Sequence, residues 1–345
     1  MTVSVRRANL ESDRGELLDL LQTNLPYLPH AQYFDWLYRD NPEGPALTWV
    51  ATEAGGPRLI GMAAAFPRRT YYLGSELCGY VLGDFCIVPE YRSLGLAVTL
   101  QRTCLEGLSE QGARFALDFP SDGMLAVYRR LRIQPDKTMI RYAKLLRANR
   151  KIAEHIALGG VADGLTAVAN GILKFRDPRS RRRTPLAIAK EHGPCGEEFT
   201  QTALRWSLTT RNCAARTADF LNWRYHQHPL RQFEMLTARG EGKLHGYLVQ
   251  HAYAEDYFID ELMGENDAVR HDLLLEAIAV ARAREVQTLC APWLSSDSLS
   301  ELLRECGFRP RESHSVVFLS WPSDEGVPGG GCEQEWYVSG GDWEH

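Results

Sequence analysis

The stretch that decides the fold is residues 81–108, V-L-G-D-F-C-I-V-P-E-Y-R-S-L-G-L-A-V-T-L-Q-R-T-C-L-E-G-L. Its first part is an apolar run over 82–88 that stops at Pro89, which is typical of a buried strand. Its second part, from about residue 95 to 111, carries apolar residues on one face and predicts a helix. A strand that turns directly into a helix is therefore the centre of this part of the chain.

The turn between this strand and helix has the composition of an anion-binding cradle. Gly95 lets the backbone approach a ligand closely, and Ala97 keeps the first helical turn uncrowded. The unpaired amides of residues 93–97 converge at the positive end of the helix dipole, which suits a phosphate or pyrophosphate. Arg92 adds a full positive charge at the rim. The pattern is neither a Walker loop nor a dinucleotide-binding GxGxxG fingerprint.

Around this segment, strand-like and helix-like patterns alternate over the first 145 residues. We expect helices that begin after Ser12 and that cover 31–39 and 122–131. We expect strands over 2–8, 47–52, 59–66, 114–119 and 138–144, the last of which closes the unit. This order, with hairpins and few crossovers, predicts a mixed sheet flanked by helices.

The second half of the chain repeats the first. The motif Trp36-x-Tyr38-x-x-x-Pro42 recurs as Trp223-x-Tyr225-x-x-x-Pro229, each time followed by a strand-like run and a glycine. Such a recurrence favours a duplicated domain. We expect four segments: a first domain over 1–145, a helical and basic linker over 146–185, a second domain over 186–325, and a Gly-rich tail over 326–345 whose aromatic residues dock onto a domain.

Length and composition restrict the class of protein. A chain of 345 residues fits two domains, and 44% hydrophobic with 24% charged residues excludes a largely disordered chain. A net charge of −5 argues against a dedicated nucleic-acid binder. No run approaches the roughly 20 apolar residues of a membrane span, and no signal peptide is visible, so we expect a cytoplasmic protein. The eight cysteines include no CxxC pair and the histidines are scattered, so we expect no metal.

The strand, cradle and following helix resemble the GCN5-related N-acetyltransferase (GNAT) superfamily over about residues 2–145. This resemblance implies an α/β (α+β) fold in which two tandem GNAT-like domains each have a mixed, mostly antiparallel twisted sheet flanked by helices. The second copy lacks the cradle and is expected to be degenerate. The resemblance implies acetyl-CoA or another acyl-CoA as donor, with its pantetheine arm on the strand and its pyrophosphate on the cradle. The residues implied in this binding are Ile87, Val88, Arg92, Ser93, Leu94, Gly95, Leu96 and Ala97.

Two residues are candidates for catalysis. The family often has a tyrosine that protonates the departing thiolate, and Tyr128 occupies that place, although Arg132-Ile133 replaces the usual Gly-Phe after it. Asp84 lies on the same strand face as Val88, where a carboxylate could deprotonate or orient an attacking amine. A structural tyrosine and a strand-end carboxylate bonded to backbone are the alternatives.

These features predict an acyl-CoA-dependent N-acyltransferase that transfers its acyl group, by direct attack, to a primary amine of a small molecule or amino sugar. One alternative is an enzyme like the N-acyl amino acid synthases, which take their acyl chain from acyl carrier protein. The acidic surface of that carrier would suit the basic run from Lys174 to Arg183. A second alternative is a non-catalytic CoA-binding or scaffold protein. Nothing in the sequence identifies the acceptor.

Overall fold

The computed structural model describes residues 3–25, 30–53, 56, 58–72, 74–153, 159–175, 182–209, 212–294, 297–321 and 335–343. The first half contains β1 (Val3–Arg7), α1 (Arg14–Asn24), α2 (Ala31–Tyr38), β2 (Leu47–Glu53), β3 (Leu59–Tyr72), β4 (Ser75–Ile87), η1 (Pro89–Tyr91), α3 (Leu94–Glu110), β5 (Phe115–Asp118), α4 (Asp122–Arg130) and β6 (Lys137–Leu145). Two helices, α5 (Asn149–Ala153) and α6 (Gly159–Phe175), follow. The second half contains β7 (Ala187–Lys190), α7 (Glu197–Thr209), β8 (Asn212–Ala214), α8 (Ala218–Leu221), η2 (Asn222–His226), β9 (Phe233–Gly240), β10 (Lys243–Tyr253), β11 (Asp256–Gly264), α9 (Asp267–Ala283), β12 (Thr288–Leu294), α10 (Asp297–Glu305) and β13 (Arg309–Ser320). The C-terminal segment adds β14 (Trp336–Tyr337) and η3 (Gly340–Asp342).

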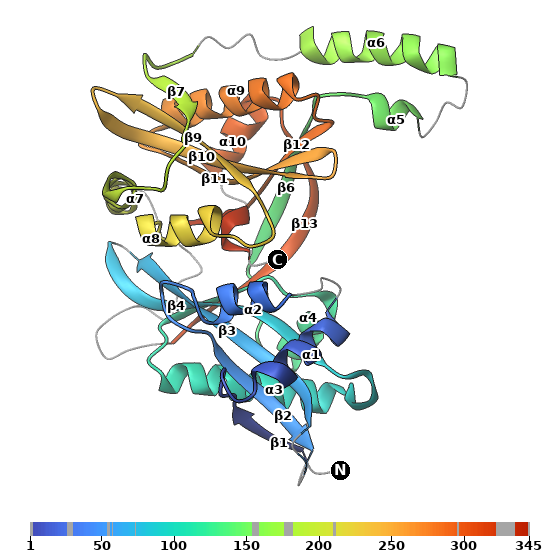
Figure 1. Ribbon diagram of the computed structural model, residues 1–345, viewed down its shortest axis with the longest axis vertical. Helices are drawn as coiled ribbons and strands as arrows, with labels where there is room; N and C mark the ends of the chain where they lie inside the picture. The colour runs from blue at the N-terminus through green and yellow to red at the C-terminus, as the bar shows by residue number, and fades with distance from the viewer. Residues whose placement is uncertain are drawn as a thin grey trace.

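The expected mixed, mostly antiparallel sheet flanked by helices is confirmed. Its strands are ordered β1-β2-β3-β4-β5-β13-β6-β12-β11-β10-β9-β7, so the second half repeats the first in reverse. In this order β13 and β6 have exchanged places between the halves. Figure 1 shows β13, in red, running from the upper half down toward the lower half.

The expectation that the strand over 138–144 closes the first half's own sheet is wrong. β6 pairs antiparallel with β12 from Met139 to Leu145. The vacant position beside β5 is taken by the last residues of β13, where Val317 lies opposite Asp118. Each half therefore receives its final strand from the other, and the division of the chain at residue 145 remains a prediction.

The repeated sequence motif marks the contact between the halves. The Trp36 and Trp223 rings stack with their centroids 4.5 Å apart. Each indole Nε1–H donates to the other tryptophan's carbonyl oxygen, and both distances are 3.0 Å. Because the two contacts are reciprocal, the motif lies on a local twofold axis. Figure 1 shows the helices beside it, α2 and α8, facing each other between the halves.

Strand β4 begins seven residues earlier than the sequence predicts. The added part of the hairpin is rich in polar residues, which conceals it from an apolar pattern. It is supported instead from the second half, because β8 pairs with β3 at Thr70 and Tyr71. Long-range pairing therefore extends these strands beyond their local signal.

Within residues 146–185, where the sequence predicts a helical and basic linker, the structure contains α5 and α6, whereas residues 182–185 are not helical. The basic residues at 176, 179 and 181 lie outside the described residues. The last two arginines of the run form ion pairs within the second half, Arg182 with Glu276 at 2.6 Å and Arg183 with Glu305 at 3.1 Å. Their charge is therefore already partnered inside this chain.

Candidate active site

Strands β4 and β5 separate where the sequence predicts the cradle. They pair only at three positions, from Gly79 opposite Phe115 to Val81 opposite Leu117. Beyond Val81, β4 continues along β3 alone as far as Ile87. A cavity of about 570 Å³ opens on its free side, lined by Asn24, Phe85, Cys86, Ile87, Arg92, Ser93, Leu94, Ala97, Ser121, Gly123, Met124 and Val127.

At the start of α3, some amides of the cradle bond within the helix and others are left for a ligand. Ser93 caps the helix, because its Oγ accepts the N–H of Leu96 at 3.3 Å and its carbonyl accepts that of Ala97 at 3.1 Å. Two amides expected to bind an anion are therefore occupied. The amides of Leu94 and Gly95 have no acceptor within the helix, as at any helix start. They are the donors that remain for an anion.

The backbone conformation of Gly95 does not require a glycine. A Cβ at this position would meet no protein atom within 4 Å, and its φ is not positive. The open space beside it can therefore take a ligand. Such a cradle, next to the free edge of β4, fits a pyrophosphate with an attached extended arm.

The two strand residues predicted to meet that arm differ. The Val88 N–H donates to Ile60 O at 2.9 Å, so it is already used across the sheet. Val88 lines a separate cavity of about 400 Å³ beside α1. Backbone groups alternate in direction, so those of Ile87 face the free edge. There the Ile87 carbonyl accepts Arg92 Nε at 3.0 Å.

Asp84 stands on a bulge in β4. Met62 pairs with Cys86 and Ala64 with Gly83, which leaves two residues of β4 opposite Ala63. Asp84 adopts a φ of +50°, a conformation that aspartate tolerates better than most residues. Its side chain is buried, and its Oδ2 accepts the hydroxyl of Tyr38 at 2.6 Å. The bulge thus turns the carboxylate into a second cavity.

This second cavity, of about 410 Å³, contains another buried carboxylate that the sequence analysis missed. Asp118, the last residue of β5, accepts the hydroxyl of Tyr128. Burial raises the pKa of Asp118 from an ordinary 3.8 to about 6, although the Tyr128 hydrogen bond lowers it in part. A polar residue that ends the apolar run Phe115-Ala116-Leu117 is the signal that could have identified it.

Tyr128 lies behind the cavity and has no exposed surface. Its hydroxyl donates to Asp118 and accepts Gln101 Nε2 at 3.3 Å. Burial, and next the Asp118 charge, raise its pKa well above 10. In this geometry the Tyr128 hydroxyl bonds to Asp118 and lowers the pKa of that carboxyl. The role of Tyr128 in protonating a thiolate remains a prediction.

The second cavity is acidic and aromatic. Its walls include two carboxylates, and no lysine or arginine is among the described residues that line it. Two of its residues come from outside the first half: His314 from β13 and Trp343 from the C-terminal segment. The full lining is Leu25, Ala64, Val81, Leu82, Gly83, Asp84, Phe85, Gln101, Asp118, Phe119, Pro120, Ser121, Met124, His314 and Trp343.

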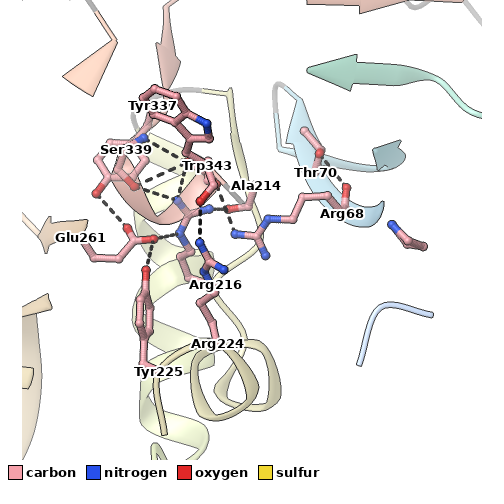
Figure 2. A network of polar contacts seen from close by, with 12 residues as sticks. Arg68, Thr70, Ala214, Arg216, Arg224, Tyr225, Glu261, Tyr337, Ser339 and Trp343 are labelled. Carbon is pink, nitrogen blue, oxygen red and sulfur yellow. Dashed lines mark hydrogen bonds and ion pairs between the residues drawn. The ribbon is translucent and has the colours of Figure 1, made fainter. Parts of the chain in front are cut away.

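The second half has a counterpart of the Tyr38–Asp84 pair that is filled by the protein itself. Tyr225, at the repeated motif position, donates to Glu261 on β11 at 3.1 Å. The Arg216 guanidinium lies against this carboxylate, with Nε 2.8 Å from Oε1. Figure 2 shows Arg216 between Glu261 and the C-terminal residues. In this half, a tyrosine-bound carboxylate therefore holds a buried cation.

Two negative findings concern the described residues only. They contain no group of three or more His, Cys, Asp or Glu side chains arranged to hold a metal ion. None of their helices has the length and apolarity needed to cross a membrane.

Comparisons with known proteins agree with this geometry. Residues 4–131 match the acetyltransferase (GNAT) domain model. A probable N-acyltransferase of Enterococcus faecalis V583 has a similar fold, with a TM-score of 0.68 and 15% identity over 93% of this chain and 73% of that one. A GCN5-related N-acetyltransferase from Anabaena variabilis has a TM-score of 0.65 and 14% identity over 92% of this chain and 73% of its own. Saccharomyces cerevisiae N-myristoyltransferase, solved with myristoyl-CoA, has a TM-score of 0.61 and 11% identity over 93% of this chain and 83% of its own.

No curated protein matches the chain. The low identities to solved structures establish the fold alone. The domain match, however, covers the bulged strand, the cradle and α3 together. Residues 4–131 therefore form an acetyltransferase (GNAT) domain, and the chain as a whole has the fold seen in GCN5-related N-acetyltransferases.

Proposed function

We propose that the chain transfers an acyl group, acetyl in the first instance, from acyl-CoA to the primary amine of a small molecule. The observation that carries this proposal is that the two cavities share Phe85, Ser121 and Met124 as walls. A donor on the cradle would therefore present its acyl end to the carboxylates of the second cavity.

The donor side is supported by residues of α3 and β4. The amides of Leu94 and Gly95 would hold the pyrophosphate, with Arg92 at the rim. The N–H of Ile87 would pair with the extended arm, since the Ile87 carbonyl already accepts Arg92. Acyl-CoA, when bound there, supplies an activated thioester. The described lining residues do not indicate the length of the acyl chain, so myristoyl-CoA should be titrated beside acetyl-CoA.

The acceptor side is supported by the two carboxylates. Asp84, fixed by Tyr38, would bind the ammonium and orient its nitrogen, as Glu261 with Tyr225 binds Arg216 in the second half. The ammonium would first lose one proton to a carboxylate, which releases it to solvent, because only the neutral amine has a free electron pair. The neutral nitrogen would then attack the thioester carbonyl, so that a C–N bond forms and the C–S bond breaks. A second proton from the nitrogen would pass through a carboxylate to the departing sulfur. Proximity of two fixed reactants supplies much of the rate.

The direct test is calorimetric titration with acetyl-CoA and myristoyl-CoA, followed by a thiol-release assay with primary amines. One site per chain and amine-dependent thiol release would support the proposal. Binding without thiol release for any amine would indicate a CoA-binding protein instead. Absence of binding to either acyl-CoA would contradict the donor assignment.

The Tyr128→Phe variant tests how the carboxylate is tuned. Because the Tyr128 hydroxyl lowers the pKa of Asp118, its loss should move that pKa above about 6. Wild-type kcat/KM should fall as the pH drops through about 6, where Asp118 takes up its proton. In the variant the acid limb should lie at higher pH, with acyl-CoA affinity unchanged. The measurement is kcat/KM from pH 5 to 9.

The same variant separates the two roles of Tyr128. A tyrosine that protonates the thiolate would lower kcat at every pH and leave the acid limb in place. Stability gives a second readout, because a pKa raised by folding means that ionised Asp118 opposes folding. The free energy of unfolding should therefore fall as the pH rises from about 4 to about 6. In the variant this fall should continue to a higher pH, because the pKa of Asp118 is higher there.

A further inference from the structure

The C-terminal segment 335–343 lies against both halves of the molecule. Its strand β14 pairs in parallel with β8, with Trp336 opposite Asn212. The Trp336 ring stacks on Phe115 of β5 at a centroid distance of 4.4 Å. The expectation that aromatic tail residues dock onto a domain is thus confirmed. The segment pairs with a strand of the second half and packs its Trp336 ring on the first half.

A buried ionic latch fixes the end of this segment. Asp342 accepts Arg216 Nη2 at 2.7 Å and Arg68 Nη2 at 3.2 Å, so one carboxylate joins an arginine of each half. Arg224 Nη2 donates to the backbone carbonyl of Trp343 at 2.6 Å. Figure 2 shows these arginines gathered on the segment. All three are buried. A buried, multiply bonded carboxylate of this kind specifies one position for the residue that follows it.

The residue so placed, Trp343, lines the second cavity, which is the proposed acceptor cavity. Its ring stacks on Phe119 at 5.2 Å and meets His314 edge-on at 5.4 Å. Phe119 and His314 line the same cavity. The Trp343 indole nitrogen is buried and has no hydrogen-bond partner among the described residues. An unpaired buried N–H is costly, and a bound polar group would satisfy it.

We infer that the C-terminal segment is the wall that selects the acceptor. The acceptor would be a primary amine on an uncharged ring that packs against Trp343 and that carries no carboxylate beside its nitrogen. This inference rests on the proposed function, and it follows from the aromatic wall together with a lining whose described residues include two carboxylates and no lysine or arginine. A carboxylate on the acceptor would be repelled by Asp84 and Asp118.

Tyramine and tyrosine form a matched pair of probes, because they share a ring and an amine and differ in the α-carboxylate. We expect kcat/KM for tyramine to exceed that for tyrosine by about tenfold or more, which corresponds to a like-charge cost near 1.4 kcal/mol. Glucosamine supplies an uncharged sugar ring for comparison. Equal use of tyramine and tyrosine would overturn the charge argument and would favour an amino acid acceptor.

The Trp343→Ala variant tests the wall itself. The latch bonds the Trp343 backbone, so removal of the side chain leaves it in place. We expect KM for tyramine to rise about tenfold, the effect of losing one aromatic contact and its N–H partner, while the dissociation constant of acetyl-CoA stays the same. Trp336→Phe is the control within the same segment, because Trp336 is not among the lining residues of this cavity.

A second variant, Asp342→Asn, removes the charge that holds the segment. It should raise KM for tyramine in the folded protein without changing acetyl-CoA affinity. If that variant does not fold, Trp343→Ala still decides the question. Unchanged KM in Trp343→Ala, in a protein that acylates tyramine, would overturn the inference and leave the proposed function intact. Absence of acylation of any amine by the wild type would instead refute the proposed function.

Discussion

Replacement of Gly95 by glutamate should abolish acyl-CoA binding. The backbone of Gly95 is compatible with any residue and an added Cβ would meet no protein atom within 4 Å, so the fold should tolerate the change. The new side chain would occupy the cradle and bring a negative charge to the donor's pyrophosphate. Repulsion of about 3 to 4 kcal/mol would weaken binding by about 100-fold or more. Calorimetric titration with acetyl-CoA measures it.

Gly164→Glu is the matched control. Gly164 lies in α6, where a Cβ likewise meets no protein atom within 4 Å, so the variant introduces the same charge in a helix far from the cradle in sequence. Its acetyl-CoA affinity and thermal unfolding should equal those of the wild type. Gly95→Ala adds a third point, since a methyl group without charge should weaken binding less than glutamate does. Wild-type affinity in Gly95→Glu would show that the donor does not use this cradle.

The cradle could be predicted because its determinants are local. A strand, a turn and a helix start lie within 28 consecutive residues, and each has its own signal in residue type and period. The repeated Trp-x-Tyr motif similarly indicated the duplication, which appears in the reversed strand order. In both cases the residues that carry the signal also make the structure.

The strand exchange could not be predicted, because it concerns which strands become neighbours. The apolar pattern of residues 138–144 predicts a strand equally well beside β5 or beside β12. The acceptor cavity was missed for the same reason. Asp84, Asp118, His314 and Trp343 come from four separate segments, and the exchanged β13 and the latched C-terminal segment bring the last two into place.

Replacement of Asp84 by asparagine should lower kcat/KM by about 100-fold, because the carboxylate that binds the ammonium and orients its nitrogen is lost. Asparagine tolerates the φ of +50° and can still accept the Tyr38 hydroxyl, so the bulge and the cavity shape should persist. What is lost is the negative charge, as amides take up no proton in this pH range. Steady-state thiol release measures the loss, and acetyl-CoA titration should show unchanged donor binding.

The variant Tyr38→Phe distinguishes charge from placement at Asp84. It retains the carboxylate but removes the hydroxyl that fixes Oδ2 at 2.6 Å, so it should cost about tenfold and mainly raise the acceptor KM. If Asp84 only completes the strand, Asp84→Asn should keep most of the wild-type rate, and Asp118 would remain as the proton acceptor. The buried Arg216 against Glu261 favours a role for Asp84 in binding the ammonium, because Glu261, the corresponding tyrosine-bound carboxylate of the second half, already holds a cation.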